Sequence, residues 1–299
     1  MMTEQVLAPA APDDAVAQFL AVRPRLFGVA YRMLGSAAEA EDVVQEAWIR
    51  WQGTNRAVVE NPAAFLTTTT SRLAINALTS ARARRETYDG PWLPEPVDTS
   101  ADPLLGAERG EALELAVLLL LEKLTPAERA AYVLREAFGY SHRQVADVLE
   151  TSEANARQLA RRARLALGSE RAAHATPARQ RELVGAFVAA ARAGRLDELE
   201  RLLARDVVMR NDGGGKVHAA RKSLHGVDRV LTFLRFVFGK PWAPGLATLE
   251  VVEANGAPAV LVRAVSGEIL TVIALEIAPH GIRQVLMVLN PDKLGHVPA

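Results

Sequence analysis

The sequence predicts a multidomain protein in which two all-α domains are followed by an α+β domain. Three observations predict this class. Apolar residues recur at helical spacing over residues 13–86 and again over 110–169. Between these blocks, residues 88–103 contain one glycine and four prolines, which is typical of a linker. From Pro177 onward, helices give way to β-branched segments with turns at Asn255-Gly256 and Ser266-Gly267.

Composition narrows the function before any motif is considered. The 299 residues carry 35 Lys+Arg against 35 Asp+Glu and no cysteine. A neutral chain is not held to nucleic acid by bulk charge, and a chain without cysteine has no disulfide, thiolate metal site or thiol nucleophile. The N-terminal residues lack the pattern of a secretory signal, and the longest apolar run, residues 116–121, is far below the roughly 20 residues of a membrane span. We therefore expect a cytoplasmic protein without a membrane anchor.

The first helical block predicts three helices. The first ends at Gly35, the second starts with a capping box of Ser36 and Glu39, and the third opens at Asn61-Pro62. On the second helix, an acidic face with an apolar centre lies opposite the apolar stripe. An ordinary solvent-exposed helix face that happens to contain one isoleucine would show the same pattern. Its residues are Asp42, Gln45, Glu46 and Ile49.

The third helix combines poor helix formers with groups that suit phosphate and bases. Four consecutive threonines, residues 67–70, are unfavourable inside a helix, but their hydroxyls can bind phosphate. The arginines near its end also suit a helix C-terminus without any ligand. The candidate DNA contacts are Thr69, Arg72, Asn76 and Arg82.

The second helical block contains a helix-turn-helix pattern. Thr125 to Glu128 and Ser141 with Gln144 form capping boxes, and Ser152 can cap the following helix. With Arg157 at zero, Arg161 falls at about 40° and Arg164 at about 340°, whereas Leu159, Ala163 and Ala166 fall near 180–240°. One face of the helix is therefore basic, and the opposite face is apolar and packs into the domain. An ordinary amphipathic surface helix would carry charges of both signs on its exposed face. The candidate duplex contacts are Ser152, Glu153, Arg157, Gln158, Arg161 and Arg164.

Two motifs carry a resemblance to a known family. The runs Phe27-Gly-Val-Ala-Tyr-Arg-Met-Leu-Gly and Ala40-Glu-Asp-Val-Val-Gln-Glu-Ala-Trp-Ile-Arg resemble region 2 of sigma-70 factors of the extracytoplasmic-function (ECF) class. Leu124-Thr-Pro-Ala-Glu-Arg and residues 141–167 resemble region 4 of the same class. The resemblance implies sigma region 2 at 13–86, a linker at 87–109 and sigma region 4 at 110–170.

The resemblance also implies partners. The acidic face would bind the β′ clamp helices of core RNA polymerase, and the β flap would be a second contact. The third helix would recognise and melt the −10 promoter element, with an extruded base held by the loop at 53–60, and the arginine face would read the −35 element as duplex. The linker would thread toward the polymerase active centre as an extended rather than a packed chain.

About 130 residues follow region 4, more than most such factors have. The linker run Gly90-Pro-Trp-Leu-Pro-Glu-Pro, the run Asp212-Gly-Gly-Gly and the run Asn290-Pro-Asp-Lys-Leu resemble the subgroup with a SnoaL-like extension of the NTF2-like superfamily. We assign this domain to 176–299, as a curved sheet wrapped by helices. Strands are expected at 207–210, 246–254, 259–265, 269–277 and 282–289, with a helix at 227–238.

Relatives of the NTF2-like domain include isomerases and polyketide cyclases, so catalysis by this domain is an alternative function. All four tyrosines precede residue 175, which argues against a tyrosine-donated oxyanion hole within this domain. Asp206, Asp212, His218 and His225 remain as conceivable acid–base groups. The spacing of ligand types supports no metal, and we expect no cofactor. The sequence favours a protein-contacting regulator that is not an enzyme, ahead of a ligand sensor or a catalyst.

We expect one regulatory interface to join this domain to the linker or to region 2. The three glycines exceed what a simple turn requires, which indicates a close approach by another backbone. Members of the subgroup are thought to be controlled by the extension itself. The expected interface residues are Trp92, Asp212, Gly213, Gly214, Gly215, Asn290, Pro291, Asp292, Lys293 and Leu294. The alternatives are a DNA-binding regulator that works without polymerase, and a ligand-sensing or isomerase-like domain fused to a sigma module.

Overall fold

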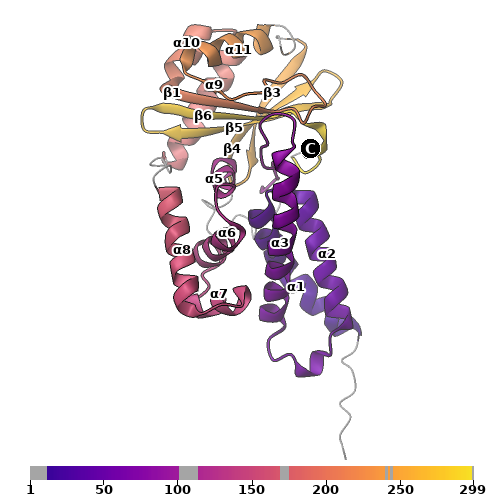
Figure 1. The fold of residues 1–299 in the computed structure, drawn as a ribbon. Helices are drawn as coiled ribbons and strands as arrows, with labels where there is room; N and C mark the ends of the chain where they lie inside the picture. The colour runs from indigo at the N-terminus through magenta and orange to yellow at the C-terminus, as the bar shows by residue number, and fades with distance from the viewer. Residues whose placement is uncertain (1–11, 101–113, 169–174, 240–241, 243–244, 298–299) are drawn as a thin grey trace, which may run out of the picture. The chain divides into compact units, whose positions relative to one another are not determined.

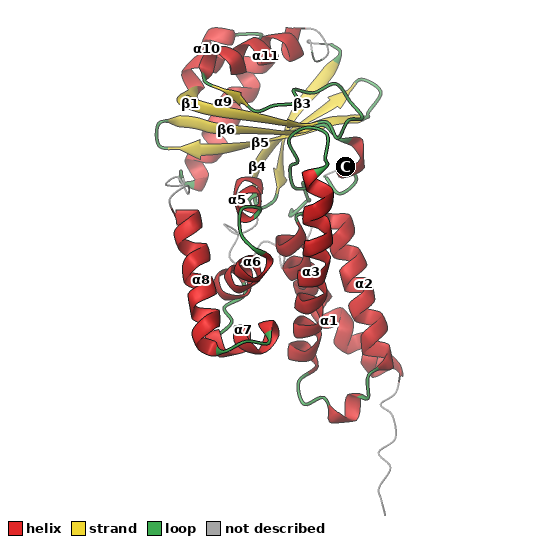
Figure 2. Cartoon of the chain, in the orientation of Figure 1, coloured by secondary structure: helices red, strands yellow, loops and turns green. Residues whose placement is uncertain are grey.

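A computed structural model describes residues 12–100, 114–168, 175–239, 242 and 245–297. The chain forms two compact units, one of residues 12–82 and 124–164 and one of residues 83–123 and 165–297 within the described ranges. The first unit is helical, and the second is built on a sheet (Figures 1 and 2). Parts of the expected linker (101–109) and the ends of the expected region 4 (110–113 and 169–170) lie outside the described residues.

The first unit contains both helical blocks. Its helices are α1 (Pro12–Leu34), α2 (Ala37–Gly53), the short η1 (Arg56–Val58), α3 (Pro62–Glu86), α6 (Pro126–Tyr132), the π-helical turn η3 (Val133–Ala137), α7 (His142–Leu149) and α8 (Glu153–Gly168). The last four residues of α3 and of α8 belong to the second unit. The capping boxes at Thr125 and Ser141 both form with their reciprocal bonds.

Buried arginines join the two helical blocks within this unit. Arg129 of α6 is 1% exposed and donates from Nε to the backbone oxygen of Arg32, at 3.3 Å. The Arg32 guanidinium in turn lies 5.2 Å from the centre of the Phe138 ring. Buried guanidinium groups persist where hydrogen-bond acceptors and ring faces satisfy them, so these contacts hold α1 against the start of the helix-turn-helix.

The second unit is a six-stranded sheet with helices on one face. The strands are β1 (Leu203–Asp212), β2 (Leu224–His225), β3 (Ala247–Ala254), β4 (Ala257–Ala264), β5 (Ile269–Ala278) and β6 (Gly281–Val288), in the order β2-β1-β6-β5-β4-β3. β1 pairs parallel with β6, and the other neighbours pair antiparallel. The five expected strands are all present within a few residues.

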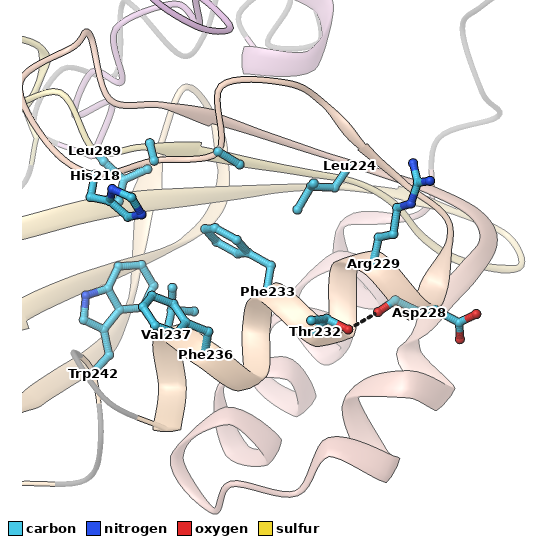
Figure 3. A pocket seen from close by; sticks show the side chains of 12 residues that line it. His218, Leu224, Asp228, Arg229, Thr232, Phe233, Phe236, Val237, Trp242 and Leu289 are labelled. Atoms are coloured by element: carbon cyan, nitrogen blue, oxygen red, sulfur yellow. Dashed lines mark hydrogen bonds between the residues drawn. The ribbon is translucent and has the colours of Figure 1, made fainter.

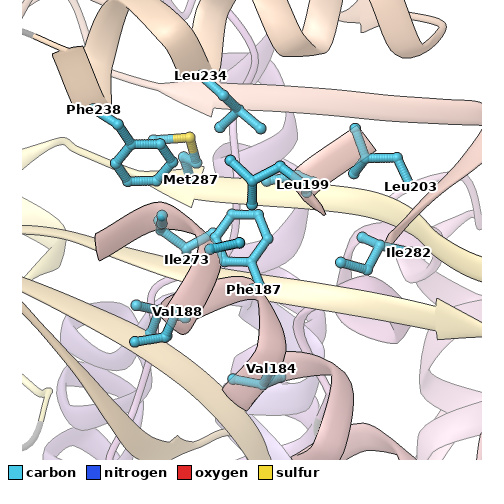
Figure 4. Packing of buried hydrophobic residues seen from close by; sticks show 14 of the residues in the cluster. Val184, Phe187, Val188, Leu199, Leu203, Leu234, Phe238, Ile273, Ile282 and Met287 are labelled. Carbon is cyan, nitrogen blue, oxygen red and sulfur yellow. The ribbon is translucent and has the colours of Figure 1, made fainter. Parts of the chain in front are cut away.

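Three helices cover one face of this sheet: α9 (Pro177–Arg192), α10 (Leu196–Leu202) and α11 (Val227–Gly239). Their side chains pack with alternate strand residues around Phe187, which is fully buried (Figure 4). Because successive strand residues point to opposite faces, Val260, Ile273 and Met287 belong to this core while their neighbours do not.

The opposite face of the sheet is covered by other parts of the same unit. Leu261, Val272 and Leu286 pack there against Leu93 of the linker and Leu115 of α5 (Leu115–Leu121). The chain end also packs there after the short helix η4 (Pro291–Lys293), through Leu294 and Val297. The sheet is therefore buried on both faces, and the second face is covered partly by sequence that precedes residue 123.

Candidate functional site

The helix-turn-helix presents the expected basic face. Ala156, Leu159, Ala160, Ala163 and Leu167 of α8 are buried, whereas the six candidate duplex contacts at 152–164 are exposed. Ser152 caps α8 by accepting from the Asn155 amide at 3.2 Å. Ala166, which was expected to pack, is exposed, whereas its neighbour Leu167 is buried.

Two arginines at the edges of this face form ion pairs, and the arginine at its centre is exposed. Arg157 pairs with Glu153 one turn earlier, and Arg164 with Glu136 of η3, at 3.0 and 2.6 Å. Arg161 lies between them on the exposed surface. Burial, followed by the charges of Arg135 and Arg157, lowers the pKa of His142 at the start of α7. The surface therefore has the cationic character that phosphate binding needs.

The candidate −10 residues all lie on α3, and two of them are already bonded. Arg82 donates from Nη1 to the backbone oxygen of Leu124 at 3.4 Å. Thr69 is half-buried, and Asn76 and Arg82 are exposed. Arg72 donates from Nε to the backbone oxygen of Val148 at 3.1 Å and from Nη2 to that of Asp147 at 2.7 Å.

The bonds of Arg72 satisfy the end of α7. Its guanidinium also pairs with Glu150 at 3.1 Å, and the carbonyls it binds belong to the last turn of that helix. Helix C-termini leave carbonyls unsatisfied and attract cations, so the pairing is favourable. Arg72 and Asn76 line one cavity of about 410 Å³ with Glu150 and Asn155. The two candidate DNA elements are thus joined within this unit.

The acidic face of α2 is free of packing. Asp42 and Gln45 are exposed, Glu46 is half-buried and pairs with Arg50, and Ile49 is 60% exposed. The opposite side of the helix carries Trp51, which is fully buried and donates from Nε1 to the backbone oxygen of Ala15 at 3.1 Å. An exposed isoleucine among acids is the composition expected of an interface centre.

The expected regulatory residues meet around the Asp212 carboxylate. This side chain is fully buried at the end of β1, on the sheet face opposite the helices. It accepts hydrogen bonds from the Tyr88 hydroxyl at 2.6 Å, the Leu93 amide at 2.8 Å and the Lys293 ammonium at 2.7 Å. Two of the three donors come from the linker. We call Tyr88, Leu93, Asp212, Asn290 and Lys293 the Asp212 cluster.

Lys293 is the second charged member of the Asp212 cluster. Its Nζ donates to the backbone oxygen of Leu93 at 2.6 Å and lies 4.4 Å from the centre of the Trp92 ring. Burial lowers the pKa of Lys293, and the charge of Asp212 opposes that shift. Burial and the bond to Asp212 raise the pKa of Tyr88 far above its ordinary value, so its hydroxyl remains a donor.

The three glycines are needed because side chains approach them closely. Gly214 has φ of +59°, and a Cβ there would lie 2.7 Å from Asn290 Cγ and 2.9 Å from Tyr88 Oη. A Cβ on Gly215 would lie 3.0 Å from Asp89 Oδ2, and one on Gly213 would meet the backbone oxygen of Val217. The neighbours are linker side chains, Asn290 and the loop itself, where the sequence had indicated another backbone.

The residues at 290–294 complete the arrangement. Asn290 donates from Nδ2 to the Tyr88 hydroxyl at 2.9 Å, and its Oδ1 accepts from the Asp292 amide. Pro291 starts η4, Asp292 pairs with Lys216 at the surface, and Leu294 is buried against the sheet. All ten expected interface residues therefore belong to one region of the second unit.

The linker is packed, contrary to the expectation of an unpacked chain. Residues 93–97 are buried, and the Val97 amide donates to Asn255 Oδ1 at 3.0 Å while the Asn255 amide donates to the Val97 oxygen at 2.9 Å. Prolines keep such a chain extended, but extension also lets alternate residues lie on an apolar sheet. Leu93 and Val97 supply that apolar surface. Sequence reasoning missed Tyr88 and Asn255, which carry no periodic signal.

The argument from tyrosine positions is also corrected. Tyr88 precedes residue 175 in sequence but belongs to the second unit and bonds Asp212. Its hydroxyl donates to Asp212 and accepts from Asn290, so both functions of that group are used. Of the other candidate acid–base groups, Asp206 is exposed and lies 3.6 Å from His280, and His218 and His225 are exposed.

No helix in the described ranges is both long and apolar enough to cross a membrane. No cluster of three or more metal-ligating side chains occurs among the same residues.

Comparison with known proteins decides the family. The pattern of Sigma-70 region 2 matches residues 19–84, and that of Sigma-70 region 4 matches residues 114–167. The ECF RNA polymerase sigma factor SigJ of Mycobacterium tuberculosis is 44% identical over 239 residues, which is 77% of this chain and 75% of the relative. The chain belongs to the ECF sigma factors.

Two further comparisons extend over nearly the whole ECF sigma factor. The probable ECF sigma factor SigI of Mycobacterium tuberculosis is 33% identical over 296 residues, covering 94% of this chain and 95% of the relative. The crystal structure of Mycobacterium tuberculosis SigJ matches with a TM-score of 0.76 and 36% identity, over 95% of this chain and 99% of that one. Sigma regions 2 and 4 are thus followed by an α+β domain, and the protein is a sigma factor that initiates transcription.

Proposed function

We propose that this sigma factor is restrained by its own C-terminal domain through the linker. The observation that carries the proposal is the position of Leu93. Its side chain is fully buried on the sheet, its amide donates to Asp212, and its oxygen accepts from Lys293. A linker held at side chain and backbone cannot thread into a polymerase. Release of the linker from the Asp212 cluster is therefore the step that permits initiation.

The surfaces of the first unit receive specific roles in this proposal. Asp42, Gln45, Glu46 and Ile49 bind the β′ clamp helices of core RNA polymerase, and the polymerase β flap is the second protein contact. Thr69, Arg72, Asn76 and Arg82 bind the −10 element as single strand. The exposed face of α8 reads the −35 duplex. All of these side chains except Thr69 and Glu46, which are half-buried, are exposed, and this exposure supports the assignment.

The bonds of Arg72 support a restrained state within the first unit as well. Its guanidinium binds the end of α7 and Glu150, so the same donors are not available to DNA. Binding of the −10 element requires Arg72 to leave α7. Opening of region 2 from region 4 and capture of the promoter are therefore coupled.

The C-terminal domain acts as a regulator rather than a catalyst in this proposal, in a cytoplasmic protein. A general base must reach a substrate proton, but the Asp212 carboxylate is fully buried and accepts three hydrogen bonds from the protein. Its role is to hold the linker.

The test is transcription by core RNA polymerase with the full-length chain on a randomised promoter library. We compare wild type with Lys293→Met and with the milder Tyr88→Phe, which removes only the hydroxyl. The control is Lys216→Met, because Lys216 pairs with Asp292 at the exposed surface. All proteins are expected to bind core polymerase, and the two cluster variants to give several-fold more transcript at limiting sigma factor.

The outcomes separate the parts of the proposal. Failure of the wild-type chain to bind core polymerase would contradict the assigned docking surface. Proteolysis at 88–97 reports whether the linker is released in the two cluster variants. If it is released and both variants still transcribe at the wild-type level, restraint by the C-terminal domain is contradicted.

A further inference from the structure

A large pocket lies on the helix-covered face of the sheet in the second unit, separate from the Asp212 cluster. It measures about 1080 Å³ and lies between α11, the segment at 218–224 and the end of β6 (Figure 3). Sites for small molecules are concave, mostly apolar and about 300–1,000 Å³ in volume. This pocket is slightly larger than that range.

The apolar surface of α11 extends beyond the part that packs into the core. Val230 and Leu234 are fully buried among the core residues, as expected for the packed side of the helix. Phe233 packs partly against that core and also lines the pocket, and Phe236, which is 51% exposed, lines the pocket as well. A surface helix normally carries polar residues on its second face. The sequence of α11 therefore forms an apolar wall that the fold itself does not cover.

Aromatic and polar groups are placed at different parts of the pocket. Phe233 points toward the space bounded by Trp242 and His218, and Arg229 lies at the other end near Leu224 (Figure 3). The carboxylate of Asp228 points away from these aromatic side chains. Flat rings favour a planar apolar occupant, and His218 and Arg229 favour an anionic or hydrogen-bond-accepting group on it.

A buried amide lies on the same sheet face, outside the residues that line the pocket. Asn211 of β1 is fully buried, and neither Nδ2 nor Oδ1 has a hydrogen-bond partner among the described residues. It pairs in register with Met287, which belongs to the helix-covered core, and Leu289 of the pocket follows two residues later. Buried polar groups are normally satisfied, so an unpartnered amide at this position indicates a water or a ligand.

We propose that this pocket is a binding site for a planar, largely apolar small molecule that carries one anionic or hydrogen-bond-accepting group. The site is well placed for an effector. Leu289 lines the pocket and is followed by Asn290. The backbone amides of both residues donate to the backbone oxygen of Asp212 at 2.8 Å. An occupant that moves Leu289 therefore acts on the Asp212 cluster. The binding site itself does not depend on the proposed restraint of the linker.

The probe is 8-anilinonaphthalene-1-sulfonate, which carries a planar apolar naphthalene ring system and one anionic group, titrated into the full-length chain. Saturable fluorescence enhancement with one site per chain is expected. Phe236→Glu places a negative charge on the pocket wall at a half-exposed position and is expected to weaken binding at least tenfold. The control is Val265→Glu, because Val265 is 73% exposed in the same domain and is not a lining residue.

Each outcome decides the proposal. Thermal unfolding that is unchanged in both variants confirms that the comparison is between folded proteins. No saturable binding, or equal binding by wild type and Phe236→Glu, would overturn the proposed site. A wild-type dimer that becomes a monomer on Phe236→Glu, in sedimentation, would assign the apolar wall to a second copy of the chain and would also overturn it.

Coupling to the linker has its own measurement. Hydrogen exchange of the Leu93 amide, which donates to Asp212, is followed with and without saturating probe. A several-fold change in its exchange rate is expected in wild type and is expected to be absent in Phe236→Glu. An unchanged rate in the probe-bound wild type would overturn the effector role.

Discussion

Lys293 Nζ lies 2.7 Å from Asp212 Oδ2, and the two side chains are 7% and 0% exposed. Both also bond the backbone of Leu93, one at its oxygen and one at its amide. The ion pair therefore holds the backbone of Leu93 between the end of β1 and η4. Loss of either charge leaves the other buried and unpaired, which is far more costly than loss of a surface pair.

We expect Lys293→Met to lower the free energy of unfolding of the second unit by about 3–5 kcal/mol, because the Asp212 carboxylate loses its buried counter-ion. The control Lys216→Met removes an exposed pair with Asp292 and is expected to cost less than about 1 kcal/mol. Urea denaturation measures both. In an Asp212→Asn background the cost of Lys293→Met should fall, since no carboxylate remains. An equal cost in both backgrounds would contradict the role of the ion pair.

Gly214→Ala tests the close approach of the linker to the glycine run. The new Cβ would lie 2.7 Å from Asn290 Cγ and 2.9 Å from Tyr88 Oη, at φ of +59°. Gly267→Ala is the matched control, because Gly267 has φ of +90° but no atom near its Cβ position. Both changes strain the backbone, and crowding should make Gly214→Ala costlier by about 1–3 kcal/mol in thermal unfolding. Equal losses would mean that only backbone conformation selects glycine at 214.

Glu150 occupies a left-handed position, with φ of 52°, directly after α7. We expect Glu150→Gly to be more stable than Glu150→Ala by about 1 kcal/mol, because glycine adopts this conformation without a Cβ penalty. Both variants lose the exposed ion pair with Arg72, so their difference isolates the backbone effect. Urea unfolding of the first unit measures it. Alanine as stable as glycine would contradict the left-handed cap.

Local patterns predicted the elements, because each depends on neighbours in sequence. The helix at 227–238 was placed within one residue of α11, and Ser141 and Gln144 form their expected capping box. The family motifs predicted which residues of the C-terminal domain gather, but not how. Tyr88 and Asp212 are separated by 124 residues, and no periodicity indicates that a proline-rich segment will cover a sheet. Arg72 is similar, since its acceptors are backbone carbonyls that every helix end possesses.

The proposed −35 contacts can be tested by the salt dependence of DNA binding. Arg161 lies at the centre of the exposed face of α8, whereas Arg162, the next residue, points aside and pairs with Glu128 at 3.2 Å. Both carry one positive charge, so the two alanine variants have the same net charge. A side chain that neutralises a phosphate releases a counterion, and its loss reduces the slope of log affinity against log salt by about 0.9.

We therefore expect Arg161→Ala in the holoenzyme to weaken binding to duplex from the selected promoters and to reduce that slope by about 1. Arg162→Ala should leave both affinity and slope near wild type. Fluorescence anisotropy over a series of potassium chloride concentrations measures the two quantities. If Arg161→Ala instead weakens only selected sequences with the slope unchanged, Arg161 contacts a base edge and not a phosphate. If Arg161→Ala leaves both affinity and slope at the wild-type values, Arg161 does not contact DNA and the proposed −35 role of this face is contradicted.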